Sequence, residues 1–127
     1  MSATDDIVAG IMAKWAEHFS RFDADAQASL YSKNALFFGS KPTLYRGRDG
    51  VAAYFNGLAK WSSREVTFTD VVAVPAGDDV INMAGIANFV IDKGVTTLSV
   101  KITWVIVRED GDWKIVSHHV SSRGALI

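Results

Sequence analysis

Hydrophobic residues recur with a helical period in the first half of the chain. The clearest stripe begins after Thr4, where apolar side chains stand three or four positions apart: Ile7, Val8, Ile11, Met12, Trp15, Phe19 and Phe22. A shorter helix is predicted to start at Asp23 or Asp25 and to run through Leu30 and Tyr31. The N-terminal part of the chain is therefore expected to be mainly helical.

A third helix is predicted to begin near Arg48 and to end near Gly57, which weakens a helix interior. Its apolar face consists of Val51, Tyr54, Phe55 and Leu58. Ahead of this helix, residues 35–38 indicate a short strand and residues 39–47 a loop.

The second half of the chain changes to the β-branched, alternating pattern of extended strands. Strands are predicted over residues 65–74, 80–91, 95–107 and 113–122, with polar turns between them. Helices followed by an antiparallel meander are typical of an α+β protein and not of repeated βαβ units. Since the 127 residues contain no repeat or linker, we expect one domain, residues 1–127, with three helices covering one sheet face.

The last predicted hairpin decides which of two adjacent histidines points into the protein. A three-residue turn with Gly111 in the left-handed conformation pairs Trp104 with Val116 and turns His118 inward. A two-residue turn would reverse this assignment and send His119 inward instead. The first register is preferred because it brings the more apolar faces of the two strands together.

Composition excludes several classes of partner. With 13 Lys and Arg against 14 Asp and Glu, the chain has no basic field for nucleic acid or an anionic membrane. It has no cysteine, no phosphate-binding glycine motif and no metal-ligand spacing, so neither a cofactor nor a metal is expected. No apolar run approaches the ~20 residues of a membrane span, and the first residues lack a signal-peptide pattern. We therefore expect a cytoplasmic protein.

Two polar residues interrupt apolar strand faces and are candidates for catalysis. His118 titrates near neutrality and could act as acid, base or ligand donor, or it could be a core histidine bonded to the backbone or a tyrosine hydroxyl. Asp70 would have a perturbed pKa if buried, although a bulge that turns it to solvent is the preferred interpretation. His119 faces the opposite way from His118, so the two cannot share a metal. His18 is expected on a solvated flank.

The order of elements resembles the nuclear transport factor 2-like superfamily, the cone-shaped fold that SnoaL-like polyketide cyclases and ketosteroid isomerase share. Residues 110–116, 119–121 and 77–79 (Asp-Gly-Asp-Trp-Lys-Ile-Val, His-Val-Ser and Gly-Asp-Asp) are similar to the association domain of calcium/calmodulin-dependent protein kinase II and its bacterial relatives. The resemblance covers essentially the whole chain. It implies three helices on a strongly curved antiparallel sheet, a pocket between them, and a dimer through the outer sheet face.

Departures from these relatives imply an apolar pocket. The base and oxyanion donors of ketosteroid isomerase correspond to positions at or near Gly39, Trp15 and Thr103–Trp104, none of which can perform that chemistry. The pocket arginines of the kinase association domain correspond to Ala87 and Trp104. The expected pocket residues are Trp15, Phe19, Tyr54, Ala87, Phe89, Trp104 and His118.

These observations favour a homodimer that binds an apolar or weakly polar small molecule. One alternative is a SnoaL-like isomerase, dehydratase or cyclase in which His118 and Asp70 transfer protons. Another is an oligomerisation module without a functional pocket, because one scaffold hosts many activities. The expected dimer face carries Thr103, Val105, Ile115, Ser117 and His119.

Overall fold

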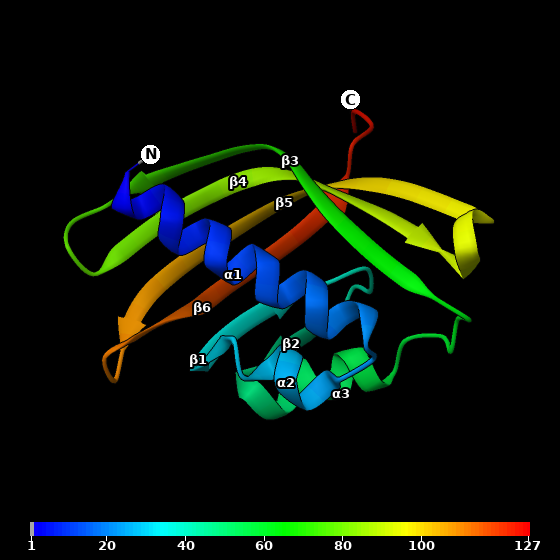
Figure 1. Ribbon diagram of the computed structural model, residues 1–127, viewed down its shortest axis with the longest axis horizontal. Coiled ribbons are helices and arrows are strands. Elements are labelled where there is room, and N and C mark those ends of the chain that lie inside the picture. Colours follow the sequence, from blue (N-terminus) through cyan, green and yellow to red (C-terminus); the bar gives the residue numbers. More distant parts are fainter. Residues whose placement is uncertain (1) are drawn as a thin grey trace.

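One strongly curved six-stranded sheet organises residues 2–127, which the computed structural model describes (Figure 1). Its strands follow the order β2-β1-β6-β5-β4-β3. The elements are α1 (Ala3–Ser20), α2 (Ala24–Ala28), β1 (Tyr31–Phe38), β2 (Leu44–Arg46), α3 (Gly47–Asn56), β3 (Arg64–Pro75), β4 (Val80–Ile91), the 3₁₀ turn η1 (Asp92–Gly94), β5 (Thr96–Glu109) and β6 (Asp112–Ser122). The predicted α+β cone-like fold is confirmed.

Helix α1 lies across the concave face of the sheet, and α2 and α3 close its lower end in Figure 1. The Oγ of Ser2, and not Thr4, caps α1 by accepting the amide of Asp5 at 3.1 Å. The buried side of α1 carries Val8, Ile11, Trp15 and Phe19, as its stripe predicts. No helix among residues 2–127 has the length and apolarity required to cross a membrane.

The segment after α2 differs from the prediction. The helix ends at Ala28, and Tyr31 begins strand β1 instead of ending the helix. The carbonyl of Leu30 accepts the amide of Ile115 at 2.9 Å, and from there β1 runs parallel to β6. The predicted loop over residues 39–47 contains the short strand β2, which pairs with the outer edge of β1. Sheet pairing satisfies backbone groups that would otherwise lack partners, so it overrides the local pattern.

The terminal hairpin has a two-residue turn and not the predicted three-residue turn. Glu109 pairs with Asp112, and Asp110 and Gly111 both have positive φ, 54° and 79°. This is the conformation of a turn whose twist matches that of the strands it joins. Taken alone, such a turn would send His119 inward.

A bulge at Val116 restores the predicted direction of His118. Opposite β5, the pairing shifts between Val105 and Ile106, so Val116 is an extra residue on β6. Trp104 therefore pairs with His118 and not with Val116, which corrects the predicted pairing. His118 still faces the interior. Ile115, expected on the outer face, is instead fully buried against the core.

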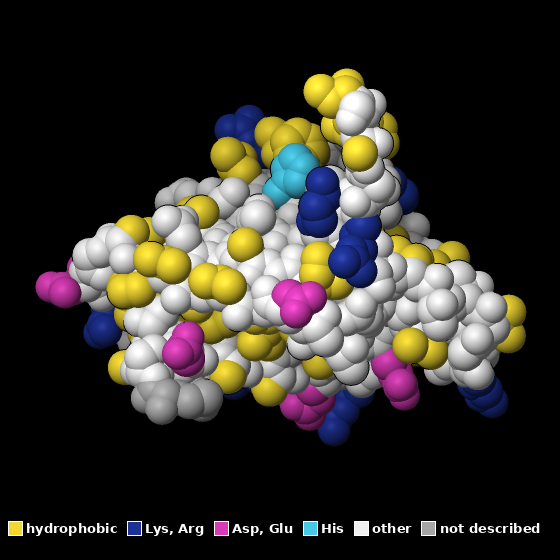
Figure 2. Space-filling view, turned by 90° about the horizontal axis from the view of Figure 1, so that it is seen from above, with side chains coloured by type: hydrophobic (Ala, Val, Ile, Leu, Met, Phe, Trp, Pro, Cys, Tyr) yellow, Lys and Arg dark blue, Asp and Glu magenta, His cyan; other side chains and the backbone are white. Residues whose placement is uncertain are grey.

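Figure 2 shows the molecule from the upper side of Figure 1, and both signs of charge appear among scattered hydrophobic side chains. Basic and acidic side chains are both scattered over this view, and neither sign forms a continuous patch. The distribution agrees with a formal net charge of −1.

Candidate functional site

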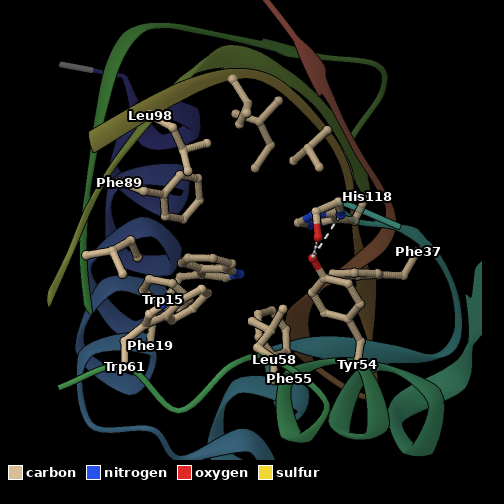
Figure 3. A pocket seen from close by; sticks show the side chains of 15 residues that line it. Trp15, Phe19, Phe37, Tyr54, Phe55, Leu58, Trp61, Phe89, Leu98 and His118 are labelled. Atoms are coloured by element: carbon tan, nitrogen blue, oxygen red, sulfur yellow. Dashed lines mark hydrogen bonds between the residues drawn. The ribbon is translucent and has the colours of Figure 1, made fainter. Parts of the chain in front are cut away.

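A cavity of about 120 Å³ lies between α1, α3 and the concave face of the sheet (Figure 3). None of the side chains that line it carries a formal charge at neutral pH. They are Trp15, Phe19, Phe37, Ser40, Tyr54, Phe55, Leu58, Trp61, Phe89, Ile91, Leu98, Val100, Ile102, His118 and Val120. Aromatic rings and aliphatic chains provide most of this surface, so an uncharged ligand would meet few unpaired polar groups.

Most of the residues expected at the pocket do line the cavity, namely Trp15, Phe19, Tyr54, Phe89 and His118. Ala87 and Trp104 do not, because both are packed completely within the core. The indole of Trp104 lies behind the cavity wall, with its ring centroid 6.4 Å from that of Trp15.

Sequence reasoning missed Phe37 as a lining residue. Phe37 lies on β1 beside His118, because these two residues are partners in the parallel pairing of β1 with β6. Parallel pairing joins segments that are distant in the chain, and no local period reveals it. The sequence shows that residue 37 is aromatic, but it does not reveal the strand register that places Phe37 beside His118.

The imidazole of His118 is held flat against Phe37. Their ring centroids are 4.0 Å apart and the ring planes differ by 16°. His118 is 4% exposed and lines the cavity. The ring therefore forms part of the cavity wall in one fixed orientation.

A chain of hydrogen bonds ends at Nδ1 of His118. The indole Nε1 of Trp15 donates to the hydroxyl of Tyr31 at 2.9 Å, and that hydroxyl lies 2.8 Å from Nδ1. The indole Nε1 of Trp104 donates to the same Nδ1 at 2.9 Å. An indole N–H can only donate, so Nδ1 must accept, and the Tyr31 hydroxyl must also donate to it. The single ring proton of neutral His118 is therefore on Nε2.

Burial keeps both members of this pair neutral. Loss of solvation lowers the pKa of His118 to about 3, and the neighbouring His119 acts in the same direction. Burial likewise raises the pKa of Tyr31 well above its ordinary value, more than the hydrogen bond from Trp15 lowers it. At physiological pH, His118 is therefore uncharged, with its one ring proton on Nε2 and no free nitrogen lone pair.

The second polar group of the cavity is satisfied within the protein. The hydroxyl of Tyr54 accepts the amide of Ser40 at 2.9 Å and lies 2.9 Å from the Ser40 hydroxyl (Figure 3). The ring of Tyr54 also occupies the space beside Gly39, where an added Cβ would clash with it. A side chain at the position that corresponds to the isomerase base would therefore have to displace Tyr54.

The other candidates lie away from the cavity. Asp70 is exposed at a bulge of β3, with φ of 54°, as the preferred interpretation predicted, so it is not available to the cavity for proton transfer. His119 is exposed on the outer face beside the ring of Phe38. His18 lines a surface groove along α1 instead. Within residues 2–127, no three His, Asp or Glu side chains are grouped to hold a metal ion.

Solved structures share this fold at low sequence identity. A Xanthomonas campestris protein, provisionally described as a calcium/calmodulin dependent protein kinase II association domain, gives a TM-score of 0.83 at 20% identity, covering 94% of this chain and 87% of its own. A Novosphingobium aromaticivorans protein, provisionally described as a scytalone dehydratase, gives 0.84 at 12% identity, covering 94% and 84%. An NTF2-like protein with a cystatin-like fold from the same organism gives 0.82 at 14% identity, covering 97% and 84%.

Sequence comparison adds the family. A search of curated protein sequences gives no match. The family model of the SnoaL-like domain, however, matches residues 8–123, which is nearly the whole chain. The structural neighbours have the nuclear transport factor 2-like, or cystatin-like, fold that the resemblance implies. The chain belongs to the SnoaL-like domain family.

Proposed function

We propose that this protein binds a neutral small molecule about the size of one ring in the cavity. The observation that carries the proposal is a preformed space of about 120 Å³ with no charged side chain in its wall. An apolar cavity of roughly 150 Å³ is known to accept benzene. Leu98 lines the cavity and is 46% exposed at the protein surface.

Binding is favoured over proton-transfer catalysis because the cavity offers no group that exchanges protons near neutral pH. The Nδ1 atom of His118 accepts hydrogen bonds from two donors, and its Nε2 already carries the proton. Asp70, the other catalytic candidate, is exposed on β3. The open space also favours binding over a pure oligomerisation module, because Trp15 and Trp104 do not fill it.

Thermal unfolding with neutral and anionic ligands of matched shape tests the proposal. We expect toluene to raise the melting temperature and benzoate at equal concentration to have no effect. A ligand at a hundred times its Kd stabilises the folded state by about 2.7 kcal/mol, which such a measurement resolves. Burying an unpaired carboxylate in this wall would cost more than the ring gains.

A filled cavity provides the control. Val120→Phe, on the cavity wall, should abolish the response to toluene, whereas Val95→Phe, at a position 83% exposed, should retain it. Stabilisation by benzoate, or no response to any neutral ring compound, would contradict the proposed function.

We also propose that the outer face of the sheet forms a twofold dimer. Exposed apolar side chains lie on this face near both edges of the sheet: Val72 at 62% and Val74 at 54% exposure on β3, and Leu36, Phe38 and Leu44 on β1 and β2. A self-complementary apolar face that a second copy covers is the usual basis of a twofold contact. Ile115 takes no part, because it is buried within the chain.

Sedimentation velocity at micromolar concentration tests the dimer. The unaltered protein is expected to sediment as a dimer. Val72→Glu should sediment as a monomer, because a dimer would bury the unpaired charge of the new carboxylate. Ala13→Glu introduces the same charge on the exposed side of α1 and should leave the dimer intact. A monomer in the unaltered protein would contradict this proposal without affecting the proposed ligand site.

A further inference from the structure

We propose that His118 determines the specificity of the cavity, because its Nε2–H donates a hydrogen bond to a carbonyl or similar neutral acceptor oxygen of the ligand. This inference rests on the proposed binding function and names the ligand class: small cyclic ketones, lactones and esters.

The Nε2 atom of His118 has no hydrogen-bond partner among residues 2–127. The indole groups of Trp15 and Trp104 donate, the Tyr31 hydroxyl both accepts and donates, and the hydrogen bonds of His118 all end at Nδ1. Nε2 is also not among the fully enclosed side-chain atoms without a partner, which belong to Gln27, so it retains some accessible surface. Since His118 lines the cavity, its free N–H is available to whatever occupies that space.

The Nε2–H group of His118 is also fixed in place. Turning the ring over would place a carbon atom opposite the N–H of Trp104 and the hydroxyl of Tyr31, leaving two buried donors without an acceptor. Parallel stacking on Phe37 at 4.0 Å holds the plane of the ring. A donor that is already oriented loses little entropy on binding, so its hydrogen bond contributes more to affinity.

The hydrogen bonds at Nδ1 also strengthen the donor at Nε2. The Tyr31 hydroxyl and the Trp104 indole share the single lone pair of Nδ1 and draw electron density from the ring, and such chains strengthen the donor at their far end. The Tyr54 hydroxyl is engaged with the amide and the hydroxyl of Ser40, and no carboxylate lines the cavity. The N–H of His118 therefore favours a ligand that carries an acceptor oxygen, and no side chain of the wall can form an ion pair with a ligand cation.

Nitrogen NMR of the uniformly labelled protein tests the inference directly. At pH 7, long-range proton–nitrogen correlations should show a pyridine-type Nδ1 and a pyrrole-type Nε2 for His118. Saturation with cyclohexanone should shift the Nε2 and Hε2 resonances downfield. Methylenecyclohexane, which has CH₂ in place of the oxygen, should bind without this shift.

The binding affinities of two His118 variants provide a second test. His118→Phe should weaken cyclohexanone binding about five- to tenfold relative to methylenecyclohexane, the value of one hydrogen bond. His118→Gln can accept through its oxygen and donate through its amide, so it should recover part of the preference. If His118→Phe does not fold, the spectra of the unaltered protein decide the question.

The outcomes separate this inference from the proposed function. If both compounds bind and the Nε2 signal is unchanged by cyclohexanone, the donor role is wrong and the binding function stands. A proton on Nδ1 in the free protein would also overturn the donor role. If neither compound binds, the proposed function fails and this inference fails with it.

Discussion

Acidification from pH 8 to about pH 4.5 is expected to reduce the free energy of unfolding by about 3 kcal/mol through His118 alone. The unfolded chain takes up the imidazole proton around the ordinary pKa of 6.5, whereas burial excludes it from the folded protein until about pH 3. Between these values the unfolded state binds more protons, so stability falls as the pH falls. The loss of stability begins near pH 6.5 and is complete near the pKa that His118 has in the folded protein.

Urea unfolding followed by tryptophan fluorescence, at several pH values, measures this dependence against a matched variant. His118→Gln removes the titrating ring but leaves every other ionisable group in place. Glu109 has a lowered pKa, chiefly because Ser32 donates a hydrogen bond to it. The stability that the protein loses in acid when Glu109 is protonated is the same in both proteins. On acidification, the free energy of unfolding of the unaltered protein should therefore fall by about 3 kcal/mol relative to that of His118→Gln. Parallel curves would show that His118 titrates normally in the folded state.

Long, regular segments could be predicted closely from the sequence. Strand β4 spans Val80–Ile91 as expected, and α1 buries the stripe centred on Trp15. Each of these elements repeats its hydrophobic signal over several turns or pleats, so one ambiguous residue does not change the assignment. Short pairings carry no such repetition. Strand β2 and the start of β1 at Tyr31 depend on partners elsewhere in the sheet, which local patterns do not reveal.

The candidate site shows the same limit at the level of single residues. The predicted direction of His118 is correct although the turn was one residue too long, because the bulge at Val116 compensates for the change of parity. The hydroxyl of Tyr31 was not recognised as its partner, since Tyr31 was assigned to a helix. Phe37 was missed for a related reason, because its position beside His118 follows from parallel pairing. Side-chain chemistry was visible in the sequence, but the contacts between distant strands were not.

Trp15→Ala is expected to reduce the free energy of unfolding by about 3–5 kcal/mol, the range for truncation of a large buried aromatic side chain. Trp15 is 2% exposed, stacks on Phe19 at 5.1 Å and meets Phe68 edge-on at 5.9 Å. The change also removes the donor to Tyr31, whose hydroxyl can still donate to His118. Chemical unfolding monitored by circular dichroism measures the loss.

The position of Trp15 in the cavity wall gives this variant a second, more specific property. The space that the indole vacates adjoins the existing cavity, so a two-ring compound such as naphthalene should stabilise Trp15→Ala more than the unaltered protein. Trp113→Ala is the matched control, because Trp113 is only half-buried, packs under the guanidinium of Arg108 and does not line the cavity. It should lose less stability and gain no response to naphthalene. If both variants lost the same free energy of unfolding, Trp15 would not be central to the aromatic core. If both responded equally to naphthalene, Trp15 would not limit the size of the cavity.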